Sequence, residues 1–301
     1  MRVLALVDLT RATPADPDGL VAASPTRRLT TSVFYPAADG LPATTSTTAR
    51  AFGDDGPAAI VDARAAAGRY PVILFSGGAP GTPDDYEPLL ATWAKLGYVV
   101  IAPEFPVSSI TGPTAVAWAD QPDQVRDARF VLHRMLDLDG APVRDGGFAG
   151  LLDRRHIAAA GHSMGGLTTL ALISRCCREP RIAAAMVLAG VSDPLAGPAL
   201  HQIKGPVLFA HDPWDIAVPF EQGKWAFAAA TPPKYLLAVD YPLAGVASHL
   251  LPYFPGTPFA AGVAAVFADF LAGYLRGDGR ALDRLAADAR SEDRLHWHAV
   301  P

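Results

Sequence analysis

The chain of 301 residues is half hydrophobic and 18% charged, with a formal net charge of −5 and no long basic run. This composition excludes an intrinsically disordered chain and provides for one large core. The acidic balance excludes nucleic acid and anionic membranes from the partners that we expect. No apolar stretch approaches the roughly 18 residues that a transmembrane helix requires, so we expect no membrane span.

The apolar run near the N-terminus is too short for the core of a signal peptide. It covers residues 3–7 and is closed by Asp8. We therefore predict a first strand here, and a cytoplasmic protein.

The two cysteines of the chain, Cys176 and Cys177, are adjacent. Adjacent cysteines cannot close a chain loop, so no disulfide framework is expected. We predict two packed thiols at the end of a helix, with a reactive pair as the alternative.

Further along the chain, short apolar runs alternate with segments of helical periodicity. The apolar runs, each predicted to be a buried strand, are residues 29–35, 72–75, 98–102, 157–160, 182–189, 206–210 and 235–239. The predicted helices cover residues 86–96, a segment that follows Pro122, a segment from residue 164, residues 220–230 and residues 259–275.

Three segments lack a clear period. Residues 37–69 are predicted to be an irregular excursion with a short helix near residues 58–67, and residues 103–121 a loop. Residues 278–301 are predicted to be a C-terminal tail with one more short helix. The alternation elsewhere predicts a single α/β domain over residues 1–301, with a mostly parallel sheet of about eight strands covered by helices on both faces.

One pentapeptide carries the chemistry. Residues 161–165 read Gly-His-Ser-Met-Gly, a G-x-S-x-G motif between a predicted strand and a predicted helix. This is the context of a nucleophile elbow, in which a strained turn presents the serine, here Ser163, at the carboxyl edge of the sheet. The small flanking glycines let the strand and the helix approach closely.

A serine nucleophile needs a histidine base that is oriented by an acid, in the chain order serine, acid, histidine. His249 follows the last predicted strand, where the base should lie. His211 precedes the expected acid, and His296 and His298 lie in the charged tail and are expected at the surface. His201 is the remaining histidine downstream of the serine. His249 is therefore the predicted base.

The acid is expected after the strand that ends at Ala210. Asp215 follows that strand in an Asp-x-x-Val-Pro context and is the predicted acid. Asp212 precedes a proline and is predicted to be a turn residue, and Asp240 is a weaker third choice.

The tetrahedral intermediate of acyl transfer needs two backbone donors, an oxyanion hole. One is predicted to be the amide of Met164, the residue after the nucleophile. The other comes from the loop after residues 72–75, with Ala79 the first choice and Gly78 the second.

Together these segments resemble the α/β-hydrolase superfamily, and within it the dienelactone-hydrolase-like group that includes bacterial cutinases and platelet-activating-factor acetylhydrolases. The resemblance implies a Ser163–His249–Asp215 triad that acts on a small-molecule ester, with no metal and no organic cofactor. The points of likeness lie, in the right order, at residues 33–37, 71–78, 97–103, 161–166, around Asp215, and at 247–249.

The chain also departs from this group. Dienelactone hydrolases use a cysteine nucleophile where this chain has Ser163, and many relatives have His-Gly in place of residues 77–78. Polyester-cleaving cutinases carry an aromatic residue and a tryptophan at the positions that match Ala79 and Val191. The residues that could line the pocket are Gly78, His162, Val191 and Trp214.

We therefore predict a serine carboxylesterase for small or short-to-medium acyl esters. A polyester or cutin hydrolase and a phospholipid acetylhydrolase are the alternatives within the same chemistry. A non-catalytic α/β-hydrolase scaffold used for binding is the alternative from another class.

Overall fold

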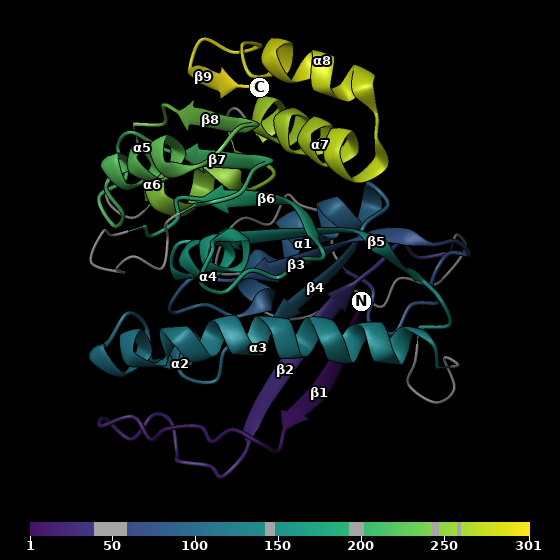
Figure 1. Ribbon diagram of the computed structural model, residues 1–301, viewed down its shortest axis with the longest axis vertical. Helices are drawn as coiled ribbons and strands as arrows, with labels where there is room; N and C mark the ends of the chain where they lie inside the picture. Colours follow the sequence, from purple (N-terminus) through teal and green to yellow (C-terminus); the bar gives the residue numbers. More distant parts are fainter. Residues whose placement is uncertain (39–58, 142–147, 193–201, 243–246, 258–259) are drawn as a thin grey trace.

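The structure, a computed structural model, describes residues 1–38, 59–141, 148–192, 202–242, 247–257 and 260–301 (Figure 1). Its centre is a nine-stranded sheet in the order β1-β2-β4-β3-β5-β6-β7-β8-β9. Neighbours from β4 to β8 pair in parallel, whereas β1 with β2, β2 with β4, and β8 with β9 are antiparallel. The strands are β1 (Arg2–Asp8), β2 (Arg27–Phe34), β3 (Tyr70–Ser76), β4 (Val99–Pro103), β5 (Leu152–His162), β6 (Ile182–Leu188), β7 (Val207–His211), β8 (Lys234–Val239) and β9 (Leu295–Val300).

Both faces of the sheet carry helices, which explains why the central strands are continuously apolar. Along β3, Val72 and Leu74 face a core with α3, α4 and α5, while Ile73 and Phe75 face a second core with α1, α7 and α8. The predicted mostly parallel α/β fold is confirmed. The helices are η1 (Pro83–Tyr86), α1 (Glu87–Lys95), α2 (Ser108–Thr111), α3 (Ala115–Asp139), α4 (Met164–Ile173), α5 (Phe220–Ala229), α6 (Ala247–Leu250), η4 (Leu251–Tyr253), α7 (Ala260–Arg276) and α8 (Gly279–Asp288).

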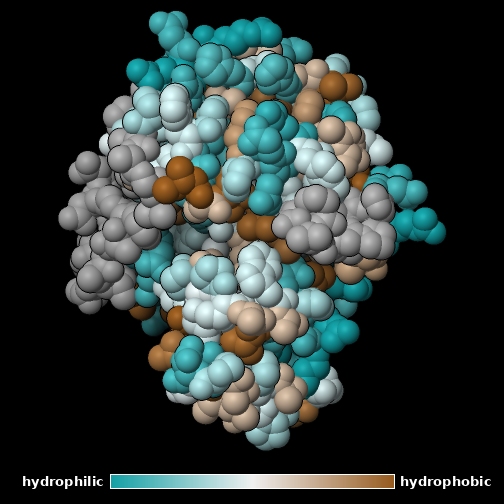
Figure 2. All heavy atoms as spheres, turned by 90° about the vertical axis from the view of Figure 1, so that its left-hand side faces the viewer, coloured by the Kyte–Doolittle hydropathy of each residue, from teal (hydrophilic) through white to brown (hydrophobic). Residues whose placement is uncertain are grey.

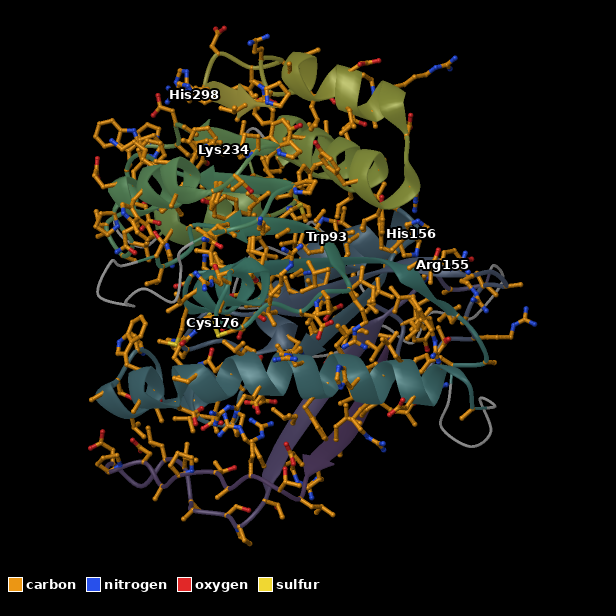
Figure 3. All side chains as sticks on the ribbon, viewed as in Figure 1. Trp93, Arg155, His156, Cys176, Lys234 and His298 are labelled. Carbon is orange, nitrogen blue, oxygen red and sulfur yellow. A yellow bond between two sulfur atoms is a disulfide. The ribbon has the colours of Figure 1, made fainter. Side chains whose placement is uncertain are left out.

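The C-terminal tail contains a strand that the sequence reading did not predict. After α8, β9 pairs antiparallel with β8 and forms one end of the sheet, opposite β1 (Figure 1). His296 and His298 lie on this edge strand and are exposed, as expected. Figure 3 labels His298 at this edge, near Lys234 of β8. The helix predicted near residues 58–67 is wrong for the described residues 59–67. There the backbone leaves helical geometry at Asp62, which has a φ of 52° and donates from its amide to the carbonyl of Met1.

The paired cysteines differ from expectation. Their sulfur atoms are joined in a disulfide between Cys176 and Cys177. Both lie in the turn after α4 has ended at Ile173, where Cys176 is exposed and Cys177 half-buried. The prediction of packed thiols at a helix end is therefore wrong, because the two sulfur atoms are bonded to each other and α4 ends at Ile173, before it reaches them.

Helix α3 begins at Ala115, although the sequence placed residues 103–121 in a loop and the helix after Pro122. The side chain of Thr114 caps the helix by accepting from the amide of Ala117 at 3.4 Å. Pro122 then lies inside the helix, where it removes one intrahelical donor. Buried ion pairs between α3 and Arg27 of β2 outweigh that loss.

A buried ion-pair network joins α3 to β2. The guanidinium of Arg27 is fully buried and donates to Asp120 at 2.6 and 2.9 Å and to Asp127 at 2.8 Å. Arg11 contacts the same Asp127 at 2.8 Å and Asp8 at 2.7 Å. Because every charge here has a partner, the network holds α3 against the antiparallel edge of the sheet.

Within these described residues, no helix combines the length and the apolar character needed to cross a membrane.

We expect Arg27→Met to lower the free energy of unfolding by about 3–5 kcal/mol, because it leaves the buried Asp120 without its cation and Asp127 with Arg11 alone. Urea denaturation measures this difference. Arg126→Met is the control: its side chain is two-thirds exposed in its pair with Asp123, and its loss should change the free energy of unfolding by less than about 1 kcal/mol. Equal effects of the two substitutions would contradict the importance of the buried network.

Candidate active site

The chain turns sharply at Ser163, between β5 and α4. Ser163 has a φ of 55° and a ψ of −122°, a region that residues with side chains rarely adopt. The turn is possible because Gly161 and Gly165 lack side chains. A Cβ atom on Gly161 would overlap the carbonyl of Gly165, and one on Gly165 would overlap the carbonyl of Ser76. This is the strand–turn–helix arrangement that the pentapeptide predicts.

The loop after β6 is tied to the same turn. The carbonyl of Ser163 accepts hydrogen bonds from the amide of Gly166 at 2.9 Å and from that of Val191 at 3.0 Å. Val191, one of the predicted pocket positions, is half-buried against the core. It therefore lies directly beside the serine.

His249 and Asp215 come together at the carboxyl end of the sheet, from α6 and from the loop after β7. The Nδ1 atom of His249 lies 2.6 Å from Oδ2 of Asp215. The other oxygen of Asp215 accepts from the amides of Ala217 and Val218 at 2.8 and 2.9 Å. Burial raises the pKa of Asp215, but the hydrogen bonds from His211, His249 and Val218 outweigh it and hold that pKa well below its usual range.

His249 also lies next to the serine turn. The centroid of its ring is 4.5 Å from that of His162, the residue before Ser163. Among the described residues, no hydrogen bond joins the hydroxyl of Ser163 to the ring of His249, and catalytic hydrogen bonds of this kind often form only when substrate binds. The structure thus brings the three predicted triad residues to one place, and their catalytic roles stay predictions.

The other acidic candidates have different partners. Asp212 accepts from the amide of Trp214 at 2.8 Å through its side chain and from that of Asp215 at 3.1 Å through its carbonyl, as a turn residue does. Asp240 accepts from the indole of Trp214 at 2.6 Å. Ser248 donates to the carbonyl of Trp214 at 3.0 Å, which joins the loop of the acid to the helix of the base.

His211 is a contact that the sequence analysis missed. It is fully buried at the end of β7, and its Nε2 atom lies 2.8 Å from the carbonyl of Val218 and 3.3 Å from Asp215. A carbonyl can only accept, so Nε2 carries the proton and also points it at the carboxylate. The spacing of four residues between His211 and Asp215 was the available signal. His201 lies outside the described residues.

The two predicted oxyanion donors lie near each other. Met164 is the first residue of α4, where an amide has no partner within the helix, and Ala79 packs against the small apolar cluster that contains Met164. No described residue accepts a hydrogen bond from either amide. The second choice, Gly78, differs: its amide donates to the hydroxyl of Tyr86 at 2.8 Å, which disfavours it as an oxyanion donor.

The protein shares its sequence pattern with one known family and its fold with a known esterase structure. The chlorophyllase family profile matches residues 53–220, more than half of the chain. The chain belongs to the chlorophyllase family. No curated protein matches it. Among solved structures, it resembles the ferulic acid esterase from Streptomyces cinnamoneus with a TM-score of 0.69 and 22% identity, over 98% of this chain and 95% of that one.

The structural likeness supports the fold, and family membership makes the protein an ester-hydrolysing enzyme of the α/β-hydrolase class. The resemblance inferred from the sequence is thereby confirmed at the level of superfamily and reaction. Among the described residues, no three His, Cys, Asp or Glu side chains are grouped to hold a metal ion.

Two of the residues expected to line the pocket of this chlorophyllase-family member are buried. His162 is only 4% exposed and Gly78 is likewise covered, so each offers little surface to a substrate, and their place in the pocket stays a prediction. His162 is buried because it is the last residue of β5 and its ring lies between the hydroxyl of Tyr86 and the backbone carbonyl of His249.

Trp214, by contrast, is 56% exposed, next to Asp215. Ile216 in the same loop is 70% exposed. Ile110 and Trp118 are also exposed, on α2 and at the start of α3. Helix α2 is joined to the loop of Ala79 by a hydrogen bond from the amide of Gly81 to the carbonyl of Ser109. Figure 2 views the side on which α2 and α6 lie in Figure 1, and apolar side chains reach the surface there among hydrophilic ones.

Burial also determines the charge of His162. Desolvation and the neighbouring His249 lower its pKa from 6.5 to about 3. In the unfolded chain, His162 is protonated below about pH 6.5. In the folded protein it stays neutral until the pH falls to about 3. In this window His162 makes the free energy of unfolding fall as the pH falls, by up to about 1.4 kcal/mol per pH unit.

We expect His162→Gln to make the free energy of unfolding depend less steeply on pH between pH 7 and pH 4. The slope should fall by an amount that corresponds to at most one proton bound by the unfolded chain and not by the folded protein. Urea denaturation at several pH values in the wild type and the variant measures the two slopes. Asp212, whose pKa burial raises to about 6, acts in the opposite direction in both proteins and cancels from the difference. Identical slopes would show that His162 is protonated in the folded state.

Proposed function

We propose that this protein is a serine esterase that works through an acyl-enzyme. Ser163 attacks the ester carbonyl while His249 takes its hydroxyl proton, and Asp215 holds the resulting imidazolium. The amides of Met164 and Ala79 bind the oxyanion. The observation that carries the proposal is the 2.6 Å contact between His249 and Asp215 beside a serine in a strained turn.

The bonds and protons balance over two half-reactions. The carbon–oxygen bond of the leaving alcohol breaks as His249 returns the proton to that oxygen, which leaves the acyl group on Ser163. Water then attacks the acyl carbon and gives its proton to His249. The acid departs as that proton returns to the serine oxygen.

The preferred substrates are small or short-to-medium acyl esters with an apolar portion. The exposed apolar side chains of Trp214 and Ile216, which flank Asp215 in the loop after β7, support this class. Hydrolysis should be compared across a panel of esters. The names of the family and of the similar structure suggest two of them, chlorophyll and a ferulic acid ester. A polyester film and a short-chain phospholipid complete it and test the alternatives.

We expect Ser163→Ala to lower kcat/KM on p-nitrophenyl butyrate by about 10⁴-fold or more, because it removes the nucleophile. The same substitution should abolish labelling by a fluorophosphonate probe. Ser174→Ala is the matched control, since its hydroxyl donates to the carbonyl of Leu170 at the far end of α4. Turnover by the purified Ser163 variant at a tenth of the wild-type rate or above would sink the proposal.

We expect Trp214→Ala to raise KM for the butyrate ester about threefold or more and that for the acetate ester less, with kcat within about twofold. The larger acyl group loses more apolar contact when the indole is removed. Leu9→Ala, an exposed apolar residue in the loop after β1, provides the control. Equal KM changes for both esters would exclude Trp214 from acyl binding.

A further inference from the structure

A chain of three hydrogen bonds, two of them fully buried, lies next to the serine turn. The amide of Gly78 lies 2.8 Å from the hydroxyl of Tyr86, and that hydroxyl lies 2.9 Å from Nδ1 of His162. The Nε2 atom of His162 lies 2.9 Å from the carbonyl oxygen of His249. The chain joins the oxyanion loop, the residue before Ser163, and the backbone of the base.

Chemistry determines the direction of each bond. The carbonyl of His249 can only accept, so Nε2 of His162 carries a proton. Burial keeps the ring neutral, so Nδ1 has none and accepts from the hydroxyl of Tyr86. That hydroxyl has one proton, now used, and its lone pair accepts from the amide of Gly78. Every donor and acceptor in the chain is therefore satisfied in one arrangement.

The surroundings hold this arrangement rigidly. Tyr86 is 4% exposed, with its ring 4.9 Å from that of Phe75 and 6.0 Å from that of Phe254. A Cβ atom on Gly78 would lie 3.0 Å from Cβ of Ser163 and from the hydroxyl of Tyr86. The oxyanion loop is thus in contact with both the nucleophile and the tyrosine, with no room for a side chain between them.

We propose that Tyr86 and His162 are positioning residues that align the oxyanion loop and the general base with Ser163. By binding the amide of Gly78, Tyr86 leaves the next amide, that of Ala79, directed at the substrate. By binding the carbonyl of His249, His162 holds the backbone of the base against the same turn. Neither side chain contacts the substrate, and this inference rests on the proposed serine-esterase function.

The test is Tyr86→Phe, which removes one oxygen and leaves the ring packing in place. We expect kcat on p-nitrophenyl butyrate to fall about tenfold or more, with KM within about twofold, because a misaligned donor weakens transition-state binding alone. The inhibition constant of a trifluoromethyl ketone, which forms a tetrahedral adduct with the serine, should rise by a similar factor. Tyr35→Phe is the matched control, a buried tyrosine that donates to the carbonyl of Ala63 at 2.8 Å.

Two substitutions of His162 separate the two bonds. Asparagine keeps an acceptor near the position of Nδ1, and glutamine keeps a donor near that of Nε2. We expect His162→Asn to retain inhibitor affinity better than His162→Gln, because the oxyanion loop depends on the bond to Tyr86. If Tyr86→Phe does not fold, the comparison of His162→Asn with His162→Gln still tests whether the bond to Tyr86 positions the oxyanion loop. Equal inhibitor affinities of the two variants would then overturn the positioning role.

Unchanged kcat and inhibitor affinity in folded Tyr86→Phe would overturn the positioning role. So would a loss of kcat that Tyr35→Phe reproduces, which would mark a general loss of stability. The wild type and Ser163→Ala in the same assay keep the two proposals apart. If the wild type does not turn over the ester or Ser163→Ala does, the serine-esterase function fails, and the positioning role fails with it.

Discussion

The functional end of the molecule depends on one strained turn. Ser163 adopts a positive φ, which costs about 1–3 kcal/mol and persists only where the surroundings enforce it. Here they do, because β5 is paired on both sides and α4 is buried along its whole length. Gly161 and Gly165 remove the two side chains that would push strand and helix apart. Gly78 after β3, Val191 after β6 and His249 of α6 then lie around the serine turn.

Three histidines near the turn differ in what their ring nitrogens contact. His249 has the carboxylate of Asp215 at Nδ1. His211 directs its Nε2 proton at a carbonyl and at the same carboxylate. His162 meets only a hydroxyl and a carbonyl, and burial keeps it neutral. Two of the three histidines therefore contact the acid, and the third contacts only neutral partners.

Much of the fold could be predicted because local pattern and tertiary structure agree. The apolar runs in β3 to β8 correspond to strands buried on both faces, which needs no knowledge of their neighbours. The beginning of α3 could not be predicted, because buried ion pairs to Arg27 stabilise turns that Pro122 would disfavour. Strand β9 was missed because its pairing partner, β8, lies about 60 residues earlier in the chain and not next to it in sequence.

By itself, the sequence determined the α/β architecture, the ester-hydrolysing class, and the order of Ser163, Asp215 and His249. These follow from periodicity and from one short motif, which are local properties. Only the tertiary structure decided that His162 is buried, that Tyr86 occupies the amide of Gly78, and that His211 faces the acid. The hydrogen bonds of His162 reach partners 76 and 87 residues away, and no local pattern encodes which polar atoms folding will bring together at such separations.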